Sequence, residues 1–148
     1  MSPMDSIAYD KAKWHYGGEF PADLDDFQGF VHTGMFLGWL MENDLISDFF
    51  KTEGLDGLQR FLAHESTGAQ IYAEWDGVLI GDMLSDLGNA FAQDYYDITA
   101  GGYMTDYEAA LCRGLPSTYH VQDTWENFEK IKQVIDGRFQ AWRAARPR

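Results

Sequence analysis

The sequence contains only one cysteine, Cys112, in 148 residues. A single thiol cannot form a disulfide within the chain, so we expect a fold that needs no oxidising compartment. The first residues lack the basic, apolar and small-residue sections of a signal peptide. The longest apolar stretch, residues 34–41, is far shorter than the roughly 20 residues that span a membrane. These absences predict a cytoplasmic protein that does not enter a membrane.

Basic residues are also scarce, because 11 Lys and Arg stand against 24 Asp and Glu and give a net charge of −13. The imbalance lies in residues 1–110, where 20 acidic and 4 basic residues give −16. Residues 111–148 hold 4 acidic and 7 basic residues and have a charge of +3. A negative field repels nucleic acids and anionic membranes and attracts basic proteins. We therefore expect a basic protein partner, with no nucleic-acid or membrane ligand.

The spaced motifs of catalysis and metal binding are missing as well. The sequence has no His-x-x-x-His, no Cys-x-x-Cys, no Gly-x-Ser-x-Gly and no phosphate-binding glycine loop. We therefore predict no catalytic residue, no metal ligand and no cofactor. One alternative stays open, in which His15 and His32 meet in space and form a metal or enzymatic site with nearby carboxylates. A structural adaptor is a further alternative.

Apolar residues, in contrast, are plentiful: 45% of the chain is apolar and 16% is aromatic. This volume suits one domain over residues 1–148 with a single packed core. Helical spacing of the apolar residues predicts a mostly α, compact fold with irregular connections. The Asp76-Gly77 pair also permits a small hairpin within residues 71–80 in place of one helix. The expected helices are 5–16, 27–42, 56–64, 67–76, 84–96, 106–111 and 123–145.

Two of these helices have features that predict packing. Gly34 and Gly38 lie on one face of the 27–42 helix, and glycine there indicates close approach of a neighbouring helix. In the last helix, Asp123 followed by Glu126 resembles a capping box. An aromatic and aliphatic stripe then follows along residues 125–142, which is typical of an amphipathic helix that covers a core.

The candidate partner-binding residues are acidic and aromatic. The acidic residues lie at the two ends of the 27–42 helix, and the aromatic residues surround the Gly17-Gly18 turn. A solvated acidic face and an aromatic plug for that turn are the simpler interpretations of the same residues. The candidates are Asp23, Asp25, Asp26, Glu42, Asp44, Trp14, Tyr16 and Phe20.

Four blocks of the sequence resemble an uncharacterised bacterial family of small acidic proteins: KWHY with FP (residues 13–16 and 20–21), HTGMFLGWL (32–40), GNAFAQDYY (88–96) and YHVQDTWEN (119–127). Some proteins of this kind are suspected toxin-immunity proteins. The resemblance implies direct binding of a cognate toxin domain in the cytoplasm, and it supplies no catalytic residue. Whether the chain forms homo-oligomers stays open.

Overall fold

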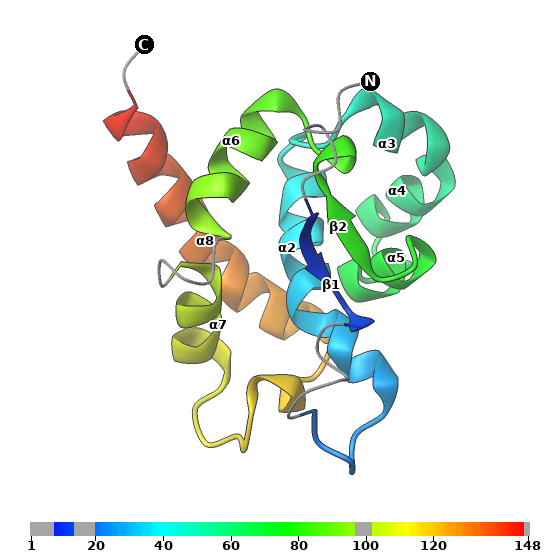
Figure 1. Cartoon of the computed structure of the whole chain (residues 1–148), viewed down its shortest axis with the longest axis vertical. Coiled ribbons are helices and arrows are strands. Elements are labelled where there is room, and N and C mark those ends of the chain that lie inside the picture. Colours follow the sequence, from blue (N-terminus) through cyan, green and yellow to red (C-terminus); the bar gives the residue numbers. More distant parts are fainter. Residues whose placement is uncertain (1–7, 14–19, 97–101, 147–148) are drawn as a thin grey trace.

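Helix α2 (Val31–Glu42) runs through the middle of the computed structural model, which describes residues 8–13, 20–96 and 102–146. Figure 1 shows α3, α4 and α5 on one side of α2, and α6 and α7 on the other. The mostly helical class predicted from the sequence is confirmed. The other elements are β1 (Ala8–Lys11), η2 (Asp26–Phe30), α3 (Asp48–Glu53), α4 (Leu55–Leu62), α5 (Gly68–Glu74), β2 (Val78–Ile80), η3 (Gly81–Met83), α6 (Asp86–Tyr95), α7 (Tyr103–Leu111), η5 (Thr118–His120) and α8 (Trp125–Ala145).

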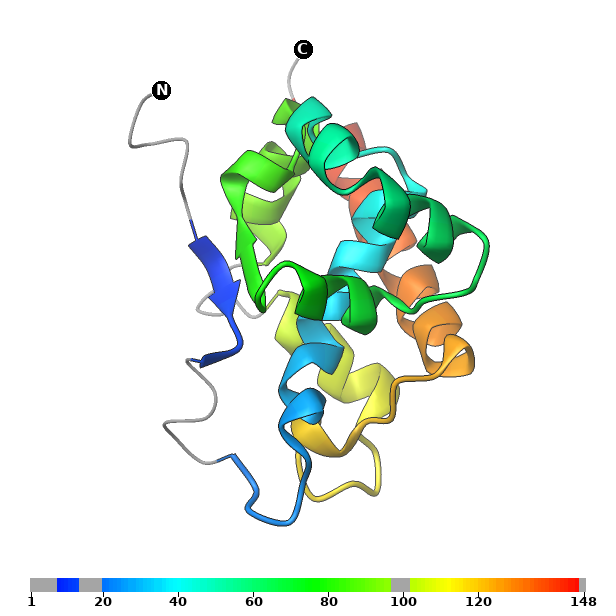
Figure 2. The same ribbon diagram turned by 90° about the vertical axis from the view of Figure 1, so that its right-hand side faces the viewer.

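The prediction of a helix over residues 5–16 is wrong for residues 8–11, which form strand β1. This strand pairs antiparallel with β2, and Figure 2 shows the small sheet at the edge of the helical body. The buried Asp10 of β1 points inward and accepts a hydrogen bond from Thr33 of α2. A distant strand and a buried polar contact therefore decide the structure of this segment, and neither is visible in local periodicity.

The Asp76-Gly77 turn is present, with positive φ angles of 61° and 67°. It joins a helix to a strand, because residues 71–74 belong to α5. The strand after the turn is β2, and its partner is β1 and not residues 71–75. A Cβ atom at Gly77 would lie 2.6 Å from the Phe30 ring, so glycine fits this turn both sterically and conformationally.

Close approach to the glycines of α2 is confirmed. Helix α5 packs against α2, where a Cβ atom on Gly68 would overlap the carbonyl oxygen of Gly34. Gly38 instead leaves room for the rings of Phe61 and Phe128, which would lie 3.1 Å from an added Cβ atom. Small residues thus allow α5 to contact the backbone of α2 directly.

The start of the last helix differs from the prediction. Thr124, and not Asp123, is the N-cap of α8, and its side chain accepts a hydrogen bond from the Asn127 amide. Asp123 instead accepts a hydrogen bond from the Thr67 hydroxyl at the start of α5. Threonine and aspartate are both good caps, so adjacent candidates are not separable by type alone.

The predicted stripe of α8 faces the core over its first half and is partly buried beyond it. Phe128, Ile131 and Ile135 are buried, whereas Phe139 and Trp142 are half-buried against the same cluster. One apolar cluster joins α8 to the central helix and to the helices on both of its sides. Within the described residues, no helix combines the length and the apolar character required to cross a membrane.

Candidate functional site

The predicted acidic residues lie in two groups at opposite ends of the η2–α2 segment. Asp23, Asp25 and Asp26 are exposed at its beginning, where Asp25 caps η2 through the Phe27 amide. Asp23 lies 3.7 Å from the His120 ring. The 12 residues of α2 alone span about 18 Å, so these acids are separate from those at the other end.

At the far end, both predicted acids are engaged in ion pairs. Glu42 is 2.8 Å from Lys132 of α8, and Asp44 is 2.6 Å from Lys51 of α3. Glu42 thereby fastens α8 to α2, whereas Asp44 pairs on the exposed surface. The Glu42 pair has a structural role, whereas the exposed Asp44 pair contributes little to stability. Both pairs leave less negative charge for a partner.

The predicted aromatic surface is described only in part. Trp14 and Tyr16, together with His15, lie outside the described residues. Phe20 is half-buried and its ring packs on Tyr119, with the ring centroids 5.0 Å apart. This contact places the Phe20 ring against η5.

His32, the second residue of the metal or enzyme alternative, is buried in α2. Its Nε2 atom lies 3.2 Å from the Asp10 carboxylate, which also accepts hydrogen bonds from Thr33 and from Tyr96 at 2.7 Å. Burial, followed by the negative charge of Asp10, raises the pKa of Tyr96 well above its usual value. The hydroxyl therefore stays protonated and donates to the carboxylate.

This buried network joins β1, α2 and the end of α6, which is a structural function. Among residues 8–13, 20–96 and 102–146, no three histidine, cysteine or acidic side chains are placed together to hold a metal ion. His15 lies outside those ranges, so the structure does not describe whether His15 and His32 meet. His32 itself is accounted for by its contact with Asp10.

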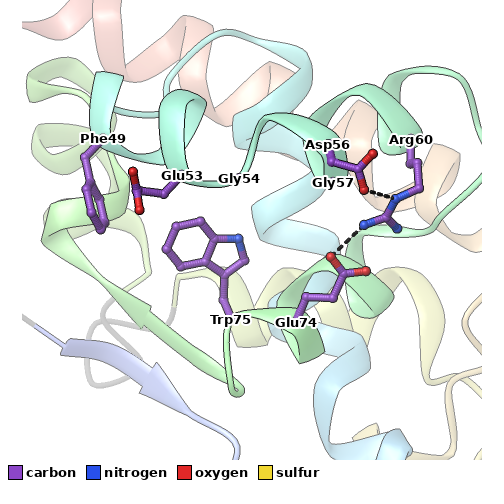
Figure 3. A pocket seen from close by; sticks show the side chains of 8 residues that line it. All are labelled: Phe49, Glu53, Gly54, Asp56, Gly57, Arg60, Glu74 and Trp75. Atoms are coloured by element: carbon purple, nitrogen blue, oxygen red, sulfur yellow. Dashed lines mark hydrogen bonds and ion pairs between the residues drawn. The ribbon is translucent and has the colours of Figure 1, made fainter.

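A groove of about 350 Å³ lies between α3, α4 and α5 and is the candidate functional site (Figure 3). Ser47 is the N-cap of α3, where its hydroxyl accepts a hydrogen bond from the Phe50 amide, and Thr67 caps α5 in a capping box with Gln70. Three acidic and one basic side chain contribute to its walls. The lining residues are Phe49, Glu53, Gly54, Asp56, Gly57, Arg60, Glu74 and Trp75.

Arg60 is held against one wall of the groove by three hydrogen bonds. Its Nε donates to Asp56 at 2.9 Å, its Nη2 to Glu74 at 2.7 Å and its Nη1 to Ser66 at 2.7 Å. The hydrogen bonds to Glu74 and then to Asp56 raise the pKa of Arg60. Arg60 therefore links α4 to α5 through its hydrogen bond to Glu74.

The indole ring of Trp75 lines the groove. Its indole stacks on the buried Phe50, with the ring centroids 4.7 Å apart and the planes at 13°. Gly54 permits this position, since a Cβ atom there would lie 2.8 Å from the indole. Phe49 meets the indole edge-on, with a centroid distance of 5.9 Å, and is 51% exposed. Figure 3 shows Glu53 near Phe49 on the α3 side of the groove.

One exposed large apolar side chain lines the groove. Among the described residues, the large apolar side chains that are exposed are Phe49, Leu55, Leu62 and Leu115, and the first three belong to α3 and α4. Of these four residues, only Phe49 lines the groove, where its half-exposed ring is available to a partner. None of the groove residues is among the binding residues predicted from the sequence.

The site is thus an acidic, aromatic groove on a helical domain. The chain belongs to the family described as a domain of unknown function (DUF7832), whose model matches residues 8–121. The match includes β1, the central helix and the whole groove, and it ends before α8. Comparison with curated proteins gives no match, and neither does comparison with solved structures.

Proposed function

We propose that this protein is a protein-binding module whose groove between α3, α4 and α5 captures a basic partner. The observation that supports this proposal best is the half-exposed Phe49 ring beside Trp75 in a groove with three carboxylates and one guanidinium. Exposed aromatic side chains supply the apolar contact area of interfaces, and surrounding charges select the partner. The proposal assigns no catalytic role to the groove.

The net charge of −13 supports a basic partner independently of the groove. A field of this strength accelerates the association of oppositely charged proteins. Asp23, Asp25 and Asp26 contribute to that long-range attraction, since all three are exposed. In this proposal they steer the partner, whereas the groove makes the close contacts.

The specific form of the proposal is an immunity-like function in a bacterial cytoplasm. The partner is then a basic toxin domain, which the protein neutralises by direct binding. This form rests on the acidic charge and on the resemblance of the sequence blocks. It predicts that the gene next to the one for this protein encodes the toxin.

Calorimetric titration with the product of the neighbouring gene tests the proposal. Phe49→Ser should weaken the complex by about tenfold or more, because an exposed aromatic residue at an interface centre contributes strongly to binding. Leu115→Ser is the matched control, since Leu115 is also exposed but lies outside the groove. Absence of binding contradicts the immunity-like form, and equal effects of the two substitutions contradict the assignment of the groove.

A further inference from the structure

The hydrogen-bonding groups of the groove define the chemistry of what it binds. Each of the three guanidinium nitrogens of Arg60 already donates to a neighbour. Glu53, in contrast, makes no ion pair or side-chain hydrogen bond within the described part of the chain. One oxygen each of Asp56 and Glu74 accepts from Arg60, and among the described residues the second oxygen of each is left for another donor. The groove therefore offers acceptors and negative charge.

The aromatic rings add a second requirement, for a flat cation. Phe50 covers one face of the Trp75 indole. Figure 3 shows the indole ring face-on in the groove, with Phe49 and Glu53 near it. A guanidinium group stacks on aromatic faces and donates two parallel hydrogen bonds to a carboxylate. An ammonium group is a compact and strongly hydrated charge that does not stack in this way.

We propose that the groove is a recognition site for an arginine side chain of the partner protein. The guanidinium lies over Trp75 and beside Phe49, and it donates to the carboxylate of Glu53. Arg60 holds Asp56 and Glu74 in place as the acidic wall. This inference rests on the proposed protein-binding function, and it names the side chain that the groove accepts.

Two short probes distinguish arginine recognition from general attraction of positive charge. These are tri-arginine and tri-lysine peptides with acetylated and amidated ends, which have equal charge. Binding is followed through the indole N–H signal of Trp75 in nitrogen-15 correlation spectra, assigned by its loss in Trp75→Phe. We expect tri-arginine to shift this signal and to bind with about threefold or greater preference over tri-lysine.

Glu53→Gln removes the unpaired carboxylate from an exposed position and should weaken tri-arginine binding about threefold to fivefold. Glu108→Gln is the control, because Glu108 is an exposed acid on α7, outside the groove, and its substitution changes the net charge equally. It should leave the affinity unchanged. The proposal is overturned if Trp75 does not respond, if both peptides bind equally, or if the two substitutions have the same effect. A failure of this peptide test does not decide the test with Phe49→Ser, because that test measures binding of the complete partner protein.

Discussion

Gly68 lies against the backbone of Gly34, so that a Cβ atom on Gly68 would overlap the Gly34 carbonyl oxygen. Gly68→Ala should therefore separate α5 from α2 and lower the free energy of unfolding by about 1–3 kcal/mol. Gly137→Ala is the control, because Gly137 lies in α8 with nothing within 4 Å of its added Cβ atom. It should stabilise the protein by about 0.5–1 kcal/mol through helix propensity. Urea unfolding measures both, and equal effects would contradict the close packing.

Two buried tyrosines provide a matched test of the Asp10 network. The Tyr96 hydroxyl donates to Asp10, so Tyr96→Phe should cost about 1–3 kcal/mol by removing one donor from a buried carboxylate. The Tyr107 hydroxyl is buried and has no hydrogen-bond partner within the described residues. Tyr107→Phe should therefore be neutral or stabilising. Thermal unfolding of the two variants checks this difference, and a larger loss for Tyr107→Phe would refute the structural function of the network.

Asp123 predicts a pH dependence of stability. Burial raises the pKa of Asp123, and the hydrogen bond from Thr67 opposes this increase. Because the folded-state pKa lies above the unfolded value, this group stabilises the fold below the unfolded pKa of about 4. That stabilisation is lost as pH rises through the folded pKa. Asp123→Asn stays neutral, so its stability relative to the natural protein should increase between about pH 4 and pH 7. Urea midpoints at both values measure the change, and a relative decrease would show that the sign is wrong.

The stripe of α8 should become less important toward the end of the helix. Ile135 is fully buried, so Ile135→Ala should lower the free energy of unfolding by about 3 kcal/mol. Phe139 is half-buried and contacts Trp39 and Phe91 edge-on, so Phe139→Ala should cost about 2 kcal/mol. Gln133→Ala is an exposed control on the same helix and should change stability by less than about 0.5 kcal/mol. A loss below about 1 kcal/mol for Phe139→Ala would instead indicate a ring available to a partner.

Helix caps and apolar spacing made much of the fold predictable from the sequence. Asp25 caps η2 and Thr67 caps α5, close to the predicted starts of the 27–42 and 67–76 helices. Strand β1 was missed because its structure depends on β2, far along the chain, and on the inward-facing carboxylate of Asp10. Local patterns describe contacts between near neighbours, and they contain little information about such long-range pairs.

The candidate site was less predictable because it is assembled from three short helices. Helix α3 has only 6 residues, too few to show a helical period. One signal was available in the Phe49-Phe50 pair. Consecutive residues on a helix point about 100° apart, so Phe49 and Phe50 point to different sides of α3. Phe50 is buried and Phe49 is exposed, but the position of Trp75 beside them required the tertiary structure.

The central claim, capture of a basic protein by an acidic surface, is tested most directly by the salt dependence of the association rate. Stopped-flow mixing with the product of the neighbouring gene measures this rate from low to physiological ionic strength. We expect association to slow by about tenfold or more, because salt screens charges beyond a Debye length of about 8 Å. Dissociation should change less. Replacing Asp23, Asp25 and Asp26 together with asparagine should lower the association rate at low salt, and η2 should stay capped because asparagine caps helices as well as aspartate does. An association rate that is independent of salt and unaffected by the triple substitution would contradict the claim.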